Sequence, residues 1–206
     1  MLFSGNKVAT LNISLKHSHE ALKHPRLTRV PNWIGLESTK EARKYLQNYK
    51  DIWASFFKKG KELLPSATKF SELKSVDTHI IEEKLYKPLY QLVGNFLEKN
   101  IVNETQTKHL FEFMVGRFNF IKFVDYDGQI EIRDFSNIPK PSSIKFGYNE
   151  KGYLQFTFDN GWILSGRLHT ATQWLKESIK FDMQPENLDA VIPAIHLSVH
   201  HQGTLR

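Results

Sequence analysis

The sequence predicts an α+β protein that forms a single domain over residues 1–206. Apolar residues recur at helical spacing through the first half of the chain and alternate with polar residues through most of the second half, and runs of helix followed by runs of strand are typical of this class. The chain shows neither an internal repeat nor a linker. Its 206 residues, 40% hydrophobic and 24% charged, suffice for a sizeable core without disulfides or metals.

Two bulk properties narrow the function. The 28 Lys and Arg residues outnumber the 22 Asp and Glu residues, which gives a net charge of +6 and favours an anionic partner such as nucleic acid. A basic surface that serves only solubility explains the charge equally well. The absence of cysteine excludes disulfides, cysteine-zinc sites and thiol nucleophiles, and no apolar run reaches membrane-spanning length. We therefore expect a cytoplasmic protein without a membrane partner.

The first half of the chain predicts one strand and three helical regions. Residues Val8–Lys16 alternate apolar with small or polar side chains, as a strand does, and lead into a histidine-rich loop. Turn residues follow at Pro25, Pro31 and Gly35. Helices are then predicted over Thr39–Lys61, capped by Ser38 or Thr39, over Asp77–Lys99 with a break or fresh start at Pro88, and over Glu104–Val115.

Beyond Gly116 the hydrophobic pattern changes to period two, which predicts a series of strands separated by turns. The turns carry Asp127-Gly128, Pro139 to Pro141, Gly152 and Asn160-Gly161. The predicted strands are Phe118–Val124, Gln129–Phe135, Tyr153–Phe158, Trp162–His169, Ser178–Gln184 and Val191–Val199. The aromatic residues in this region, Trp162, Phe118, Phe120 and Phe123 among them, are interpreted as core because they fall on apolar strand patterns.

The segment from Lys16 to Arg26 is the strongest local concentration of basic side chains. It holds Lys16, His17, His19, Lys23, His24 and Arg26 within eleven positions. Such side chains can hold phosphate oxygens, although a solvated basic loop is the simpler interpretation. Zinc binding by the three histidines matches no common spacing, and a histidine general base would need a Ser or Thr partner. A lysine at the end of a strand can stabilise charge that develops on a phosphate.

This segment carries a family resemblance. The run Ile13-Ser14-Leu15-Lys16-His17-Ser18-His19, followed by Ala21, Lys23-His24 and Arg26-Leu27, resembles the signature of the HaeIII-type family of type II restriction endonucleases. Further blocks in the same order extend the resemblance over nearly the whole chain: Tyr86-Lys87-Pro88-Leu89, Gly161-Trp162, Arg167-Leu168-His169-Thr170-Ala171 and Ser178-Ile179-Lys180-Phe181-Asp182.

The resemblance implies a PD-(D/E)XK-type core with a helical insertion and a mostly antiparallel carboxy-terminal sheet. It further implies hydrolysis of double-stranded DNA at the palindrome GGCC with Mg²⁺, in a restriction-modification system with a cognate DNA methyltransferase and with the enzyme as a possible homodimer. Lys16 matches the catalytic lysine, with His17 and His19 beside it, and Ser14 stands where many related nucleases carry an acidic residue.

The sequence departs from the family upstream of Lys16. The family carries a metal-binding aspartate on the preceding strand, whereas Met1 to Leu15 contain no Asp or Glu. A hard divalent cation requires carboxylate oxygens, and Glu20 is only a weak candidate because a surface role explains it better. We therefore expect a domain truncated at its amino terminus that cleaves DNA poorly by itself.

The carboxy-terminal strands add a second group of basic side chains. Alternation places Arg167 and His169 on the same face of one predicted strand. It places Lys180 and Asp182 on the same face of the next predicted strand. Arg167 or Lys180 can contact guanine O6 and N7, and with His169, Lys23, His24 and Arg26 they form the predicted DNA-binding set. An exposed sheet face with an incidental Lys180–Asp182 pair is the simpler interpretation.

Three functional hypotheses follow. The first is a type II endonuclease with Lys16 in its centre. The second is a non-catalytic DNA-binding remnant of such an enzyme, which lacks the metal-binding aspartate. The third is a nuclease of the HNH type using His17 and His19, for which the later Asn and His residues are not evident at clear spacing.

Overall fold

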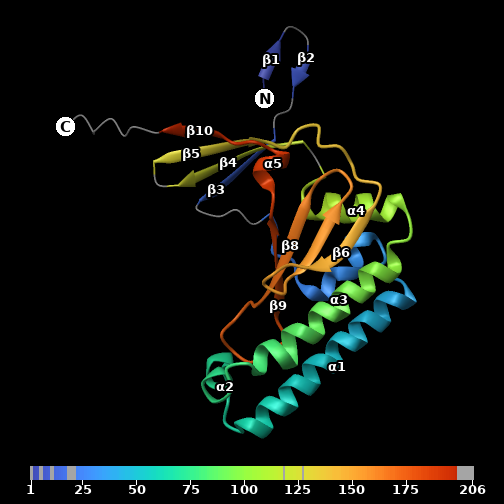
Figure 1. The fold of residues 1–206 in the computed structure, drawn as a ribbon, viewed down its shortest axis with the longest axis vertical. Helices are drawn as coiled ribbons and strands as arrows, with labels where there is room; N and C mark the ends of the chain where they lie inside the picture. The colour runs from blue at the N-terminus through green and yellow to red at the C-terminus, as the bar shows by residue number, and fades with distance from the viewer. Residues whose placement is uncertain are drawn as a thin grey trace, which may run out of the picture.

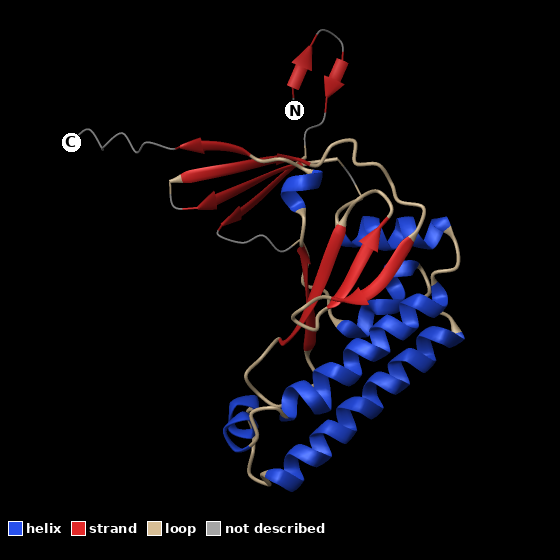
Figure 2. Ribbon diagram, in the orientation of Figure 1, coloured by secondary structure: helices blue, strands red, loops and turns tan. Residues whose placement is uncertain are grey.

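The chain folds as a mixed α+β structure, as the sequence predicted. The computed structural model describes residues 2–4, 7–9, 12–17, 22–117, 119–126 and 128–198. Helices gather at one end and cover one four-stranded sheet, while a second four-stranded sheet lies at the other end with only a short helix beside it (Figures 1 and 2). A small hairpin of β1 (Leu2–Ser4) and β2 (Lys7–Ala9) precedes both sheets.

The helical layer follows the predicted capping chemistry. Helix α1 (Lys40–Leu63) begins after Thr39, whose side-chain oxygen accepts a hydrogen bond from the backbone N–H of Ala42 at 3.1 Å. Helix α4 (Glu104–Met114) is capped in the same way by Asn103, and α3 (Lys87–Asn100) carries a proline in its first turn, as expected at Pro88. The remaining helical segments are η1 (Leu27–Ile34), α2 (Phe70–Val76) and η2 (Glu82–Tyr86). None of the described helices is both long and apolar enough to cross a membrane.

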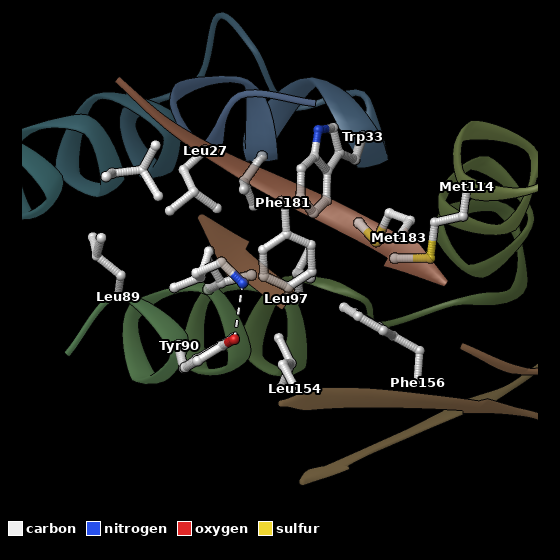
Figure 3. Packing of buried hydrophobic residues seen from close by; sticks show 14 of the residues in the cluster. Leu27, Trp33, Leu89, Tyr90, Leu97, Met114, Leu154, Phe156, Phe181 and Met183 are labelled. Carbon is white, nitrogen blue, oxygen red and sulfur yellow. Dashed lines mark hydrogen bonds between the residues drawn. The ribbon is translucent and has the colours of Figure 1, made fainter. Parts of the chain in front are cut away.

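The sheet beside the helices is entirely antiparallel, in the order β6-β7-β8-β9. Its inner face packs on the helices and forms the core (Figure 3), in which Tyr90 of α3 accepts a hydrogen bond from the backbone N–H of Leu168 at 2.9 Å. At Gly166 a β-carbon would lie 1.6 Å from the Phe181 ring, so the absence of a side chain lets that ring lie directly on β8. The strands are β6 (Ile144–Tyr148), β7 (Leu154–Phe158), β8 (Ile163–Thr170) and β9 (Ile179–Pro185).

The second sheet has the order β10-β5-β4-β3 and contains a parallel pair. Strand β3 (Ile13–His17) runs parallel to β4 (Ile121–Tyr126), and the helices α1 to α4 form the long connection between them. Strands β5 (Gln129–Asp134) and β10 (Ile195–Ser198) complete the sheet in antiparallel pairing, after the short helix α5 (Leu188–Val191). The helices between β3 and β4 and the mostly antiparallel pairing agree with the mixed α+β class, whereas the strands predicted beyond Gly116 divide between two sheets.

Several elements differ from the sequence prediction. The single strand predicted over Val8–Lys16 is wrong, because the chain forms β2 and then β3 there. The strand predicted over Val191–Val199 is shorter, because Asn187 begins the helical turn α5 before β10. The elements that were not predicted include β1, η1, which has Pro31 inside it, the seven-residue α2 and the five-residue β6. Pro31 lies inside η1 and α2 has only seven residues, so neither helix shows a clear hydrophobic period.

Candidate functional site

The histidine-lysine segment continues past β3 and lies along the free edge of β9. The backbone N–H of Leu22 donates to the Met183 carbonyl at 3.0 Å, and Met183 and Phe181 in turn donate to Lys23 and Pro25 at 3.0 and 2.9 Å. Isolated antiparallel bridges join Lys23 to Met183 and Arg26 to Lys180. This segment therefore acts as a further strand beside β9.

The antiparallel register aligns six polar side chains from three strands in two rows. Five of them belong to the predicted DNA-binding set, and the sixth is Asp182. Residues opposite each other in an antiparallel pair share a face of the sheet. Arg167 pairs with Asp182 and His169 with Lys180, while the bridges place His24 opposite Asp182 and Arg26 opposite Lys180. We call this arrangement the two-row block: Arg167, Asp182 and His24 in the first row, and His169, Lys180 and Arg26 in the second.

Asp182 anchors the first row. Its side chain is only 5% exposed, and its Oδ2 accepts hydrogen bonds from Arg167 Nη2 at 3.0 Å and from Gln184 Nε2 at 3.3 Å. His24 Nδ1 lies 2.9 Å from Oδ1, although that oxygen makes no hydrogen bond of good geometry among the described residues. A protonated His24 would complete an ion pair there. The buried carboxylate thus fixes two basic side chains from separate strands.

The basic side chains of the block are open to an incoming ligand. The Arg167 side chain is 49% exposed and that of His24 is 38% exposed, whereas Asp182 lies buried between them. The His24 and His169 rings meet edge to face, with centroids 6.3 Å apart. A face with three permanent cations around one buried carboxylate can bind phosphate oxygens and acceptor atoms of guanine.

Buried tyrosines hold the strands of the block against the helices. The Tyr90 hydroxyl binds the backbone of Leu168, and burial raises its pKa well above the ordinary value despite that hydrogen bond. Burial likewise raises the pKa of Tyr49 to about 12, against a hydrogen bond with Ile179 that lowers it. Both phenols therefore stay protonated at neutral pH. These hydroxyls hold the backbone at Leu168 and Ile179, which are sequence neighbours of residues in the two-row block.

Lys23 is separated from the other predicted DNA-binding residues. Because it pairs with Met183, it faces the helices, and its Nζ lies 4.4 Å from the centroid of the Phe113 ring. It lines a pocket of about 400 Å³ together with Trp33, His109 and Arg117. Burial lowers the Lys23 pKa. Five of the six predicted residues share the block, and Lys23 does not.

The strand of the predicted catalytic lysine lies in the other sheet. Lys16 is in register with Val124 of β4, which is in register with Glu131 of β5. His17 is in register with Asp125, and His19 lies outside the described residues, as do Glu20, Phe118 and Asp127. The position of Lys16 near the end of its strand agrees with the sequence interpretation.

Glu131 is engaged in a buried ion network. Arg133 Nε lies 2.5 Å from Glu131 Oε1, and both side chains are under 9% exposed. Arg133 also donates to the Ile192 carbonyl at 2.6 Å and pairs with Asp189 of α5 at 2.7 Å. Burial lowers the pKa of Arg133, but the bonds to Glu131 and Asp189 more than offset this and leave the pKa raised. This network joins β5 to α5 and to the chain that leads into β10.

The described residues do not complete a metal site. They contain no group of three His, Cys, Asp or Glu side chains that would hold an ion, and Glu131, the carboxylate in register with Lys16, already pairs with Arg133. Magnesium prefers carboxylate oxygens and ordered waters, so this donor set does not fit it. The zinc interpretation of the three histidines depends on His19, which lies outside the described residues.

Sequence reasoning missed the central role of Asp182. It placed Asp182 beside Lys180 as an incidental pair, whereas the carboxylate binds Arg167 and His24 across two strand boundaries. An acidic residue between apolar positions of a strand was the only signal. Of the aromatic residues assigned to the core, Trp162 is 2% exposed and Phe120 packs against the core cluster, whereas Phe123 is half-buried outside that cluster.

Comparison with known proteins gives two matches. The profile of the HaeIII restriction endonuclease family matches residues 5–138. The type II restriction enzyme HaeIII of Haemophilus aegyptius is 26% identical over 212 aligned residues, which cover 88% of this chain. The chain spans 63% of the length of that enzyme. No solved structure matches the chain at a significant level.

Proposed function

Because this chain belongs to the HaeIII restriction endonuclease family, we propose that it acts in hydrolysis of double-stranded DNA at a short palindrome, with GGCC as the site. The enzyme would work in the cytoplasm within a restriction-modification system, beside a cognate DNA methyltransferase, and as a homodimer on its palindrome. The observation that carries the proposal is the two-row block, an open basic face that the fold builds from three strands. The family match favours this enzyme function over a binding protein that has lost catalysis.

The block supplies the recognition part of the proposal. Arg167 Nη2 donates a hydrogen bond to Asp182 Oδ2, and this contact orients the guanidinium. A guanidinium held in this way can donate two hydrogen bonds to guanine, at O6 and N7. Lys180 and Arg26 lie one row further on, where they can contact the phosphate backbone. A GC-only site offers guanines on both strands for such contacts.

The proposed reaction centre lies at the end of β3. We assign Lys16, with His17 and His19 beside it, to the charge that develops on the phosphate under attack by water. The two sheets then belong to one PD-(D/E)XK-type domain, with the parallel β3–β4 pair in its core. The proposed magnesium requirement rests on the family alone, since the described residues do not complete its ligand set.

One assay tests the proposal directly. The purified chain is titrated with a GGCC duplex and with a scrambled duplex, with and without Mg²⁺, and both binding and nicking are measured. We expect tighter binding to the GGCC duplex, in a salt-dependent manner. Equal, weak binding to both duplexes at low salt would refute the assignment of the block to sequence recognition.

Arg167→Ala should remove discrimination between the two duplexes. Loss of a bidentate guanine contact costs about 1–3 kcal/mol of discrimination, or roughly 5- to 150-fold in the ratio of dissociation constants. Fluorescence anisotropy with labelled duplexes measures that ratio. Arg167→Lys is the matched control, because it retains the charge but not the fork of donors. If Arg167→Ala discriminates as well as the parent chain, Arg167 does not read a base.

Asp182→Asn should change affinity and discrimination in opposite directions. Removal of a negative charge makes the face more basic, so binding to the scrambled duplex should tighten. The salt dependence of that binding should also steepen, because up to about one more counterion is released from the DNA. Arg167 and His24 lose their common anchor, so the preference for GGCC should fall. Dissociation constants measured at several salt concentrations separate the two effects. A parallel change for both duplexes would contradict the anchoring role.

A further inference from the structure

The pocket of about 400 Å³ that Lys23 lines has no part in the DNA contacts proposed above. It lies where α4 and η1 meet the edge segment, residues 22–26, that pairs with β9. The lining residues used below are Lys23 on the edge segment, Trp33 in η1, His109, Glu112 and Phe113 on one face of α4, and Arg117. Because neighbouring residues of a strand point to opposite faces, Lys23 enters the pocket while His24 belongs to the two-row block. The pocket is therefore a separate site.

The charge of the pocket wall is predominantly positive. Lys23 and Arg117 form no ion pair with the acidic residues that the structure describes, and His109 adds a titratable donor. Glu112 is acidic, but Lys140 lies 3.4 Å from its Oε1, so that carboxylate is already paired. Burial is the cause of the lowered Lys23 pKa, and an anion beside the ammonium would favour its charged form. An anion in the pocket would thus meet two cations without partners.

Trp33 indicates independently that an acceptor belongs in this pocket. Its side chain is 1% exposed, and its indole Nε1 has no hydrogen-bond partner among the described residues. The Phe113 ring stacks on the indole with centroids 5.2 Å apart, and Phe181 packs on it at 5.8 Å, so the indole is held in place. Figure 3 shows the nitrogen at the end of the indole that lies away from Phe181. A buried indole N–H normally finds an acceptor, so a fixed, unpaired donor in a pocket wall favours a ligand that supplies one.

We propose that this pocket binds a phosphate monoester of nucleotide size, whose phosphate group is held by Lys23, Arg117 and Trp33 Nε1. Phosphate oxygens can accept from an ammonium, a guanidinium and an indole N–H at once, whereas a carboxylate offers only two oxygens to these three donors. The volume of about 400 Å³ falls within the range of small-molecule sites, about 300–1,000 Å³. A free nucleotide and the 5′ end of a DNA strand both carry this group. The proposal does not depend on recognition of GGCC by the two-row block.

The test is isothermal titration calorimetry of the purified chain with deoxyguanosine monophosphate (dGMP), inorganic phosphate and deoxyguanosine. We expect dGMP to bind, phosphate to bind more weakly and deoxyguanosine not to bind. Lys23→Met and Arg117→Gln should each weaken dGMP binding at least about tenfold, because each removes a charge-assisted hydrogen bond. Arg117 is exposed, so its replacement should leave folding intact. Trp33→Phe keeps a stacked ring without the donor and should weaken binding roughly two- to tenfold. Lys145→Met, at an exposed lysine on β6, is the matched control and should bind like the parent chain.

A second arm identifies the source of the phosphate with two scrambled duplexes that differ only in a 5′-phosphate. Tighter binding of the phosphorylated duplex, lost in Lys23→Met, would place a strand end in the pocket, whereas binding of dGMP with no difference between the duplexes would place a free nucleotide there. The proposal is overturned if neither dGMP nor phosphate binds at millimolar concentration and the duplexes bind equally. It is also overturned if deoxyguanosine binds as tightly as dGMP, or if Lys23→Met and Arg117→Gln bind dGMP like the parent chain. Arg167→Ala should retain dGMP binding, so failure of this pocket is distinguishable from failure of the two-row block.

Discussion

Replacing Arg133 with Met should lower the free energy of unfolding by about 3–5 kcal/mol. The side chain of Arg133 is 6% exposed and contacts Glu131, the Ile192 carbonyl and Asp189. Removal of the guanidinium leaves the Glu131 carboxylate buried without its charged partner, and this desolvated charge is the main source of the cost. Urea unfolding followed by circular dichroism gives the free energy directly.

Two control variants separate the buried charge from the surface contact. Asp189→Ala removes the third contact of Arg133, but the Asp189 side chain is 87% exposed, so the effect should be small. The double variant Arg133→Met, Glu131→Leu removes both buried charges and should regain much of the loss, because an apolar pair of similar volume fills the space. A single Arg133→Met variant as stable as the parent chain would show that Glu131 finds another partner.

The elements predicted well are those whose signals are local. Thr39 caps α1 within one residue of the predicted start, and Pro88 lies in the first turn of α3, because capping and proline geometry act over a single turn. The strands β5, β7, β8 and β9 were also located within about two residues, since alternation over five to eight residues is a strong signal.

The arrangement of the site depended on pairing between distant segments, which one sequence does not show. Five of the six basic residues predicted to contact DNA lie together in the block, but nothing near His24 indicates that it pairs with Asp182. Had the segment from Leu22 to Arg26 been interpreted as a strand, alternation alone would have separated Lys23 from His24. Pro25 and the lack of β-branched residues concealed that strand.

The charged face of the second sheet was also unpredictable from its own strand. Glu131 and Arg133 alternate with Ile130 and Ile132, and such a pattern ordinarily directs the charges to solvent. The structure reverses it because Asp189 of α5 and the carbonyl of Ile192, a residue within the predicted strand Val191–Val199, supply partners for Arg133. The identity of the buried face was therefore decided by a short helix that carries no clear hydrophobic period.

Lys16→Ala should reduce the rate of DNA cleavage by about 10²- to 10³-fold, with DNA affinity nearly unchanged. Removal of one group that stabilises charge in a transition state has effects of this size, and the two-row block, which carries the proposed DNA contacts, lies in the other sheet. The rate is measured under single-turnover conditions with a GGCC duplex and Mg²⁺.

Lys16→Arg should not restore that rate, because the planar guanidinium cannot replace a compact ammonium at the end of β3. Lys145→Ala is the control, since Lys145 is an exposed lysine on β6 of the other sheet, and it should cleave like the parent chain. A Lys16→Ala variant that cleaves as fast as its parent would remove Lys16 from the mechanism. Loss of cleavage in Lys16→Ala alone, with the GGCC preference intact, would place the chemistry on β3 and the recognition on the strands of the block.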